Sequence, residues 1–286
     1  MKKYKIEKLI VYNIILLIPL ILYGVYKNGY LIYQKDLINF VSIFKPIFLV
    51  LIGIIIKFII DIIRYKKIKI DYNLVYVILI GMIMPYNINL ILYSILLLLL
   101  YLSTLFLEKH FKFNKICLIY LILILSNLFI NSFTFESIID QKYTYSFEFL
   151  DILMGRSVGG ISSTSILFSL VAYILLINNF YYKKDIPLAI NITYLLLAGI
   201  YCMFTENYLV LINSDLIFGS IFISALPEYT PYKVKNQIIY GIFIGMLSFV
   251  FSITLNSIIS IYLSTLIASV FINIKNRQKV TKLPIA

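Results

Sequence analysis

Apolar blocks alternate with short polar stretches along the whole chain. The blocks are about 20 residues long, the length that a helix needs to cross roughly 30 Å of hydrocarbon. A membrane β-barrel would need short alternating segments instead. The pattern therefore predicts an all-α polytopic membrane protein with about ten transmembrane helices, near residues 9–26, 41–63, 72–85, 89–107, 116–132, 160–177, 187–204, 208–226, 237–254 and 257–274.

The composition supports the membrane class. Of the 286 residues, 62% are hydrophobic and 13% are charged, whereas a soluble domain is nearer half apolar and a quarter charged. The basic start leads into an apolar run with no small-residue cleavage site after it, so we expect a first spanning helix rather than a cleaved signal peptide.

The net charge of +12 could suggest a nucleic-acid partner, but the positive residues lie in short loops, where they orient a membrane protein. One set of loops holds 19 Lys and Arg, in stretches 2–8, 64–69, 109–115, 183–184, 233–235 and 275–282. The opposite loops hold Lys27, Lys35, Lys45, Lys142 and Arg156. This bias predicts a multi-pass protein of the cell membrane that has both termini in the cytoplasm and an even number of spans. Its expected partner is the lipid bilayer, and we expect no nucleic-acid partner.

The spans divide into two equal groups, within a single integral membrane domain of residues 1–286. The first half-repeat covers 1–132, an acidic extracytoplasmic loop covers 133–159, and the second half-repeat covers 160–286. Because five is odd, the halves have opposite orientations, which is the layout of two inverted five-helix repeats. Pro85 in "GMIMPYN" and Pro227 in "SALPEYT" each follow the third span of their half.

The stretch "SALPEYTPYKVKNQIIYGIFIG" separates the eighth and ninth spans. Pro227 and Pro231 cannot continue a helix, so the eighth span stops near Leu226. Gly241 and Gly245 lie on one helix face and permit close helix contact. Composition alone favours a cytoplasmic turn between two packed helices.

The stretch "MGRSVGGISSTSIL" combines glycines with hydroxyl residues at the predicted start of the sixth span. Backbone amides at a helix N-terminus, glycines and hydroxyls can form an anion or phosphate cradle. Packing of small residues together with an N-cap explains the same residues about as well. The candidate cofactor-binding residues here are Arg156, Gly159, Gly160, Thr164 and Ser165.

The outer loop adds two further candidate hydroxyls, Thr144 and Ser146, flanked by aromatic residues in "DQKYTYSFEFLD". Aromatic residues at the membrane face usually form an interfacial belt. The alternative is that they stack on a planar ring.

Few charges lie inside the spans. Lys57 and Asp61 are spaced to pair on one helix face, with Lys57 extending toward the cytoplasm. Asp215 lies about a third of the way into the eighth span and is a candidate for a cation or proton path, unless it is close enough to the interface to stay hydrated. Cys117 and Cys202 lack metal-ligand spacing, and we expect them to be small buried apolar residues, with no metal site.

Several of these stretches resemble the RnfD/NqrB family of membrane proteins, whose members belong to the Rnf complex and to the Na⁺-translocating NADH:quinone reductase. The late family motif reads roughly D-P-V-T-S-P, then I-Y-G-x-x-I-G. It is matched here by Pro227, Pro231, Ile239, Tyr240, Gly241, Ile244 and Gly245. The family's G-x-x-x-G-S-I-G-E-T-S resembles 155–165, its F-N-P-A resembles Phe113 and Asn114, and the likeness extends roughly from Asp71 to Asn273.

The chain departs from the family pattern at three points. Leu226 stands where the motif has an aspartate, and Ser163 stands where it has a glutamate. The flavin attachment motif S-G-A-T has no clean copy. Counting from Asp140, the attachment position falls on Ser146, with Thr144 two residues earlier.

The resemblance implies a subunit of an ion-translocating electron transport complex that carries or contacts FMN on the extracytoplasmic side, works beside other membrane subunits, and couples electron transfer to Na⁺ or H⁺ movement. Such a subunit would not be catalytic alone but would serve a ferredoxin:NAD or NADH:quinone oxidoreductase. A solute transporter or channel and a scaffold subunit without flavin stay open as alternatives. The late motif favours the redox and scaffold roles over a transporter, and the missing attachment motif favours the scaffold.

Overall fold

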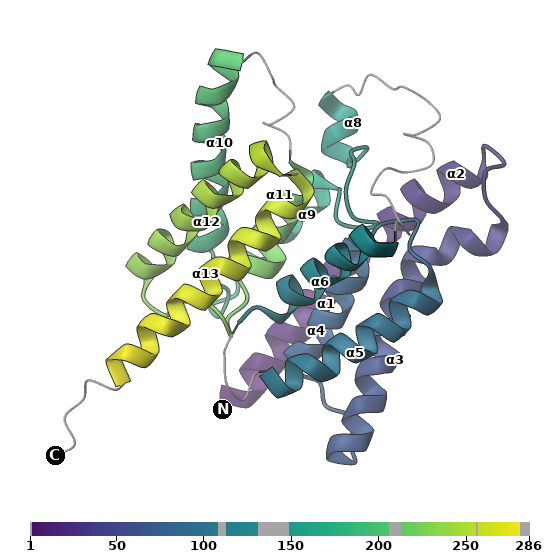
Figure 1. Ribbon diagram of the computed structural model, residues 1–286, viewed down its shortest axis with the longest axis horizontal. Coiled ribbons are helices and arrows are strands. Elements are labelled where there is room, and N and C mark those ends of the chain that lie inside the picture. The colour runs from purple at the N-terminus through teal and green to yellow at the C-terminus, as the bar shows by residue number, and fades with distance from the viewer. Residues whose placement is uncertain (1, 108–112, 131–148, 206–212, 256, 281–286) are drawn as a thin grey trace.

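The computed structural model describes residues 2–107, 113–130, 149–205, 213–255 and 257–280 (Figure 1). Helices make up nearly all of the regular structure, and no strand occurs among the described residues, so the predicted all-α class is confirmed. Thr144 and Ser146 lie outside the described residues.

The helices follow the apolar blocks. In chain order they are α1 (Lys2–Val25), the π-helical turn η1 (Tyr26–Tyr30), α2 (Leu31–Tyr33), the 3₁₀ turn η2 (Phe40–Phe44), α3 (Lys45–Tyr65), α4 (Tyr72–Ile83), α5 (Leu90–Leu107), α6 (Lys115–Ile130), α8 (Phe149–Met154), α9 (Ile166–Ile177), α10 (Asp185–Thr205), α11 (Ser214–Gly219), the π-helical turn η4 (Ser220–Ser224), α12 (Val234–Thr254) and α13 (Ser257–Val280).

Each of the ten predicted spans overlaps an apolar helix, but these helices differ in length. Four helical stretches are long and apolar enough to cross a bilayer: Lys8–Tyr33, Phe40–Tyr65, Asp185–Thr205 and Val234–Thr254. The other apolar helices in the described part of the chain are shorter. The structure therefore supports an integral membrane protein without fixing the number of complete crossings at ten.

Two short helices form the centre of the molecule. Every residue from 74 to 86, in α4 and just after it, is buried, and so is nearly all of α11 and η4. The 12 residues of α4 rise about 18 Å, well short of a bilayer crossing. A helix that is apolar all round and this short is stable in the membrane because other helices surround it.

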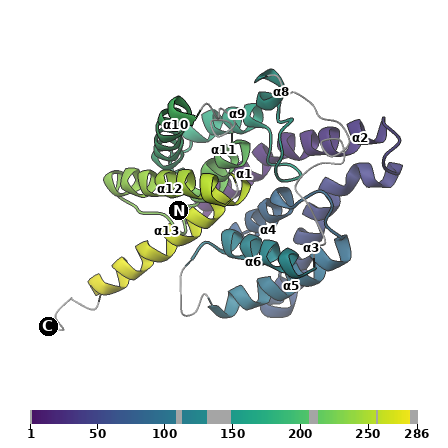
Figure 2. The ribbon, with the colours of Figure 1, turned by 45° about the horizontal axis from the view of Figure 1, so that its top comes forward.

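The remaining helices form two groups around this centre. Helices α3 to α6 lie together on one side and α9 to α13 on the other (Figure 2). Helix α1 contacts α3 and α4 as well as α9, and α6 contacts α13, so these helices join the two groups.

The paired glycines of α12 produce the close helix contact that their spacing predicts. A Cβ atom added to Gly241 would lie 2.6 Å from the Ala189 Cβ atom, and one added to Gly245 would lie 2.8 Å from the Ile190 carbonyl oxygen. Both neighbours belong to α10. The predicted close helix contact is therefore confirmed, but its partner is α10, the seventh predicted span, and not the eighth span on the other side of the turn. Both cysteines are free and buried, also as expected.

The ion pair between Lys57 and Asp61 is confirmed, with 2.5 Å between Nζ and Oδ2. The Lys57 side chain extends toward the stretch after α3, which the charge bias assigns to the cytoplasmic side, but it is enclosed by protein and has no exposed surface. The Lys57 ammonium instead donates to the Lys69 carbonyl oxygen and lies 3.4 Å from Asp71 Oδ1. The chain after α3 folds back over this lysine and supplies the polar partners that water would otherwise provide.

The positions of Lys27 and Lys45 also differ from the prediction that both lie in loops. Helix α1 continues through η1 into α2, so Lys27 lies inside a helical stretch and is buried. Lys45 is the first residue of α3. The sequence "YKNGY" is typical of a loop, but other parts of the chain satisfy its polar groups within the fold, as shown next.

Candidate functional site

A loop of irregular backbone enters the buried centre between α8 and α9. The sequence predicts that this central loop, residues 155–165, is partly helical, with a span beginning near residue 160. That prediction is wrong, because α9 begins at Ile166. Gly155 has a φ angle of +105°, which favours glycine, and Ser165 caps α9 by accepting a hydrogen bond from the Phe168 amide.

The backbone of the central loop is bonded to the end of α4. The Ile161 amide donates to the Met84 carbonyl oxygen at 2.8 Å, and the Ser162 amide donates to the Met82 carbonyl oxygen at 2.9 Å. Irregular backbone inside a membrane protein is tolerated where protein surrounds it and its polar groups are bonded. The central loop meets that condition by using carbonyl groups that α4 leaves free at its C-terminus.

Helix α1 reaches the central loop through the π-helical turn η1. Lys27 Nζ donates to the Ser157 carbonyl oxygen at 2.6 Å and to Thr164 Oγ1 at 3.1 Å. Asn28 Nδ2 donates to the Ile161 carbonyl oxygen at 2.7 Å. A π-helical turn widens the helix locally and often marks a functional site. Here three consecutive residues, 27–29, are buried in it.

Helix α11 contributes a carboxylate on the opposite side of the central loop. Asp215 Oδ1 accepts hydrogen bonds from Ser163 Oγ at 2.6 Å and from Tyr262 Oη, on α13, at 3.3 Å. The hydroxyls of Ser157 and Ser214 are 2.9 Å apart. We call these seven residues the polar centre: Lys27, Ser157, Ser163, Thr164, Ser214, Asp215 and Tyr262.

Asp215 is the least compensated member of the polar centre. It is 1% exposed. Among the described residues its Oδ2 atom accepts no hydrogen bond of normal geometry, although the Gly160 backbone amide interacts with the carboxylate. The alternative that Asp215 stays hydrated at the interface is therefore wrong, because protein encloses it. Its position in the first turn of α11 favours a negative charge, and Lys27 acts on it electrostatically.

The predicted site residues of the central loop fall into three groups. Gly159, Gly160 and Thr164 are buried at the polar centre, and Ser165 serves as the cap of α9. Arg156 is separate from them. Its side chain is 48% exposed and pairs with Asp151 at 2.9 Å.

Sequence reasoning missed the parts of Lys27, Asn28 and Tyr262 in this site. The signal for the first two was present, since a Lys-Asn pair directly after an apolar block can be a buried polar turn as well as a loop. Nothing in the sequence pairs Tyr262 with Asp215, because the contact depends on how α11 packs against α13.

The central loop does not form an open phosphate cradle. A Cβ atom on Gly159 would lie 2.3 Å from Asp215 Oδ2, and one on Gly160 would lie 2.7 Å from the Ile83 Cα atom. The space beside the two glycines is therefore filled by a carboxylate and by backbone. A carboxylate repels a phosphate group, so these residues do not fit the phosphate of FMN in this arrangement.

The part of the polar centre around Asp215 is better suited to a proton or a small cation than to a phosphate. A carboxylate and the Ser163 and Tyr262 hydroxyls meet there, and oxygen ligands are those that hard cations prefer. The Lys27 ammonium already occupies the Ser157 carbonyl oxygen and the Thr164 hydroxyl. An ionisable group buried within membrane-spanning helices is a functional candidate by default. The unpartnered Oδ2 is the atom at which a proton or a metal cation would gain most.

The helices and this buried ionisable centre define an integral membrane protein with a charged group enclosed among its helices. A model of the NQR2, RnfD, RnfE family matches residues 103–281. The match covers more than half of the chain, and the chain therefore belongs to the NQR2, RnfD, RnfE family. No curated protein matches it.

Residues 103–281 contain most of the motifs that resemble the RnfD/NqrB family. This range includes the late proline and glycine motif, the central loop, and Phe113 with Asn114, and it begins after the stretch around Pro85. Asn114 Oδ1 accepts hydrogen bonds from the Ile116 and Cys117 amides, so this asparagine caps the start of α6. The family is one of membrane subunits of Rnf- and Nqr-type complexes.

Proposed function

We propose that this protein is a membrane subunit of an Rnf- or Nqr-type electron transport complex in which the polar centre lies on the path of Na⁺ or H⁺. The unpartnered Oδ2 of the buried Asp215 carries this proposal. A buried carboxylate oxygen without a partner is costly, and a passing cation would remove that cost for as long as it stays. Ser163 and Tyr262 hold the other oxygen in place.

The proposed architecture is two inverted five-helix repeats, and the helix contacts support it. In the first half α3 contacts α5, α4 contacts α6, and α5 contacts α6. In the second half α10 contacts α12, α11 contacts α13, and α12 contacts α13. The two short buried helices, α4 and α11 with η4, hold the same place in this scheme. Broken or short helices that meet near the midplane are the usual place for an ion site in such repeats.

The proposed orientation has both termini in the cytoplasm. It rests on the lysine and arginine bias between the loops. One hollow is lined by residues of three predicted cytoplasmic loops, namely 70–72, 180–183 and 227–232, together with Ile10. The loops assigned to one side by charge therefore lie close together in the fold.

The test of the ion path is the variant Asp215→Asn, in the assembled complex reconstituted into vesicles. Asparagine keeps an acceptor for Ser163 and Tyr262 but carries no charge, so we expect normal expression and electron transfer with reduced ion uptake. Asp36→Asn is the matched control, because Asp36 is exposed and has a φ angle of 54°, which asparagine tolerates. Ion uptake that is unchanged in Asp215→Asn would remove this residue from the path.

The proposed cofactor is FMN on the extracytoplasmic side, held through Thr144 or Ser146. A flavin would supply one-electron and two-electron transfer there. The protein is expressed with a flavin transferase, denatured and tested for in-gel fluorescence. We expect a fluorescent band that is lost in a Thr144→Ala/Ser146→Ala double variant and kept in the control Ser94→Ala, which alters an exposed hydroxyl of α5. A dark band for the unmutated protein would favour a scaffold subunit without covalent flavin.

A further inference from the structure

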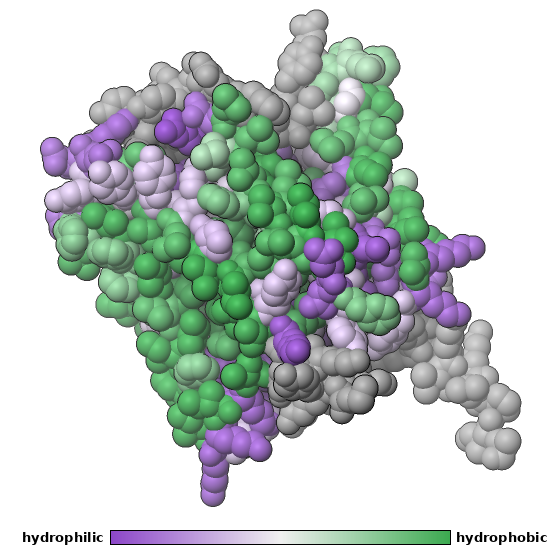
Figure 3. Space-filling view, turned by 180° about the vertical axis from the view of Figure 1, so that it is seen from behind, coloured by the Kyte–Doolittle hydropathy of each residue, from purple (hydrophilic) through white to green (hydrophobic). Residues whose placement is uncertain are grey.

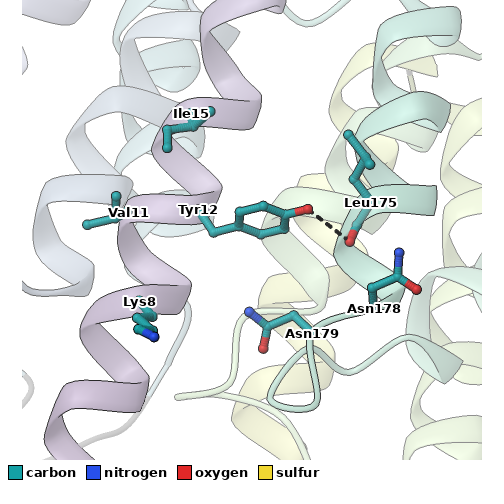
Figure 4. A pocket seen from close by; sticks show the side chains of 7 residues that line it. All are labelled: Lys8, Val11, Tyr12, Ile15, Leu175, Asn178 and Asn179. Carbon is teal, nitrogen blue, oxygen red and sulfur yellow. Dashed lines mark hydrogen bonds between the residues drawn. The ribbon is translucent and has the colours of Figure 1, made fainter.

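A groove runs between α1 and α9, where the two halves of the molecule meet. Its volume is about 520 Å³, within the range of ligand pockets. Helix α1 contributes Lys8, Val11, Tyr12 and Ile15, which share one helix face, and the other wall is formed by Leu175, Asn178 and Asn179 (Figure 4). The Tyr12 hydroxyl donates to the Leu175 carbonyl oxygen at 3.3 Å across the groove.

The groove is polar at one end and apolar at the other. Lys8, Asn178 and Asn179 lie toward the same end, while Ile15 and the Leu175 side chain lie toward the other (Figure 4). Val11, Ile15 and Leu175 are exposed large apolar residues on helices that the bilayer surrounds. A molecule that fills this groove therefore needs an apolar chain joined to a polar head.

The polar end favours an anionic head. Lys8 supplies a positive charge, and the amides of Asn178 and Asn179 supply hydrogen-bond donors that suit phosphate oxygens. No acidic side chain lines the groove among the described residues. Basic pockets between membrane helices are known to take acidic lipid head groups.

We propose that this groove binds one anionic phospholipid, with its phosphate beside Lys8, Asn178 and Asn179 and an acyl chain along Val11, Ile15 and Leu175. The lipid would join α1 to α9, and thus the first half to the second, next to the Tyr12–Leu175 hydrogen bond. This inference does not depend on ion transport or on flavin.

The test compares phosphatidylglycerol with phosphatidylcholine of the same acyl chains, added to the purified full chain in detergent. Bound lipid is counted by native mass spectrometry, and the apparent Tm is measured in parallel. We expect phosphatidylglycerol to be retained in preference and to raise the Tm more. Lys8→Gln should reduce that preference about fivefold, the effect expected of one lysine near a charged head group, with phosphatidylcholine retention unchanged.

Two controls separate the site from general charge effects. Lys67→Gln removes the same charge from an exposed position after α3 and should leave the preference unchanged. Val11→Phe fills the apolar wall and should lower retention of both lipids. Equal retention of the two lipids by the unmutated protein, or an unchanged preference in Lys8→Gln, would overturn the proposal. The proposal would also be overturned if inorganic phosphate alone raised the Tm as much as phosphatidylglycerol does, because the acyl chain would then have no part in binding.

Discussion

Two opposite charges at the polar centre come from different halves of the chain. Lys27 reaches the central loop from η1, and Asp215 reaches it from α11. Each charge is costly to bury alone, and an opposite charge nearby lowers that cost. The hydroxyls of Ser163 and Thr164, neighbours in the central loop, each contact one of the two charges.

The first prediction concerns the coupling of these two charges. We expect Lys27→Met to destabilise the protein, because Thr164 and the Ser157 carbonyl group lose their donor and Asp215 loses its compensating charge. The loss should be smaller when Asp215→Asn is already present. The double-mutant cycle, from denaturant unfolding in detergent, should give a coupling of about 0.5–3 kcal/mol. Lys67→Met with Asp215→Asn is the control pair, for which we expect no coupling free energy. If the coupling free energy of the Lys27–Asp215 pair were also zero, the two residues would be independent.

At the scale of elements, the apolar pattern is enough to locate the helices but not their irregular parts. Length and hydropathy identify α3, α10 and α12 because each is a continuous apolar block. The π-helical turn η1 and the central loop escape prediction, since both contain polar residues and glycines that are typical of surface loops. The burial of η1 depends on partners in the central loop, and that of the central loop on partners in α4 and α11. All of these partners are distant in sequence and leave no local signal.

The contact between α10 and α12 gives a prediction at this scale. Gly245→Ala places a methyl group 2.8 Å from the Ile190 carbonyl oxygen, so the helices must separate. We expect a loss of about 1–3 kcal/mol, the usual cost of overpacking, measured as the free energy of unfolding in detergent.

Gly199 provides the matched control for Gly245 on the same helix pair. A Cβ atom at Gly199 would have no neighbour within 4 Å. Gly199→Ala should therefore be neutral or stabilise α10 by up to about 1 kcal/mol through helix propensity. If both substitutions had the same effect, close packing of α10 and α12 would not be the cause.

On the face of the molecule that Figure 3 shows, apolar residues cover most of the described surface and polar residues gather in patches. Among the described residues, two aromatic side chains in the predicted cytoplasmic loops are almost fully exposed, Phe180 at 94% and Tyr232 at 87%. Both line the hollow of about 790 Å³ between the loops of the lysine-rich side. Exposed aromatic residues around a pocket are typical of a protein interface.

We therefore expect the other subunits of the complex to contact this hollow. Phe180→Ser with Tyr232→Ser should weaken co-purification of the partner subunits about tenfold or more, since aromatic anchors dominate interface energies. Leu196→Ser changes an exposed apolar residue within α10 and should retain the partners if that face meets lipid. Undiminished co-purification of the double variant would place the partners elsewhere on the molecule.

The hydrogen bonds between the central loop and α4 also constrain the order in which the chain can mature. Helix α4 is synthesised well before residues 161 and 162 leave the ribosome. Until then the Met82 and Met84 carbonyl oxygens lack the amide donors that they have in the complete fold. Each unsatisfied group of this kind costs several kcal/mol in hydrocarbon. We therefore expect the first half alone to be an incomplete intermediate during biogenesis, with α4 protected by other proteins or lipids until the second half is inserted.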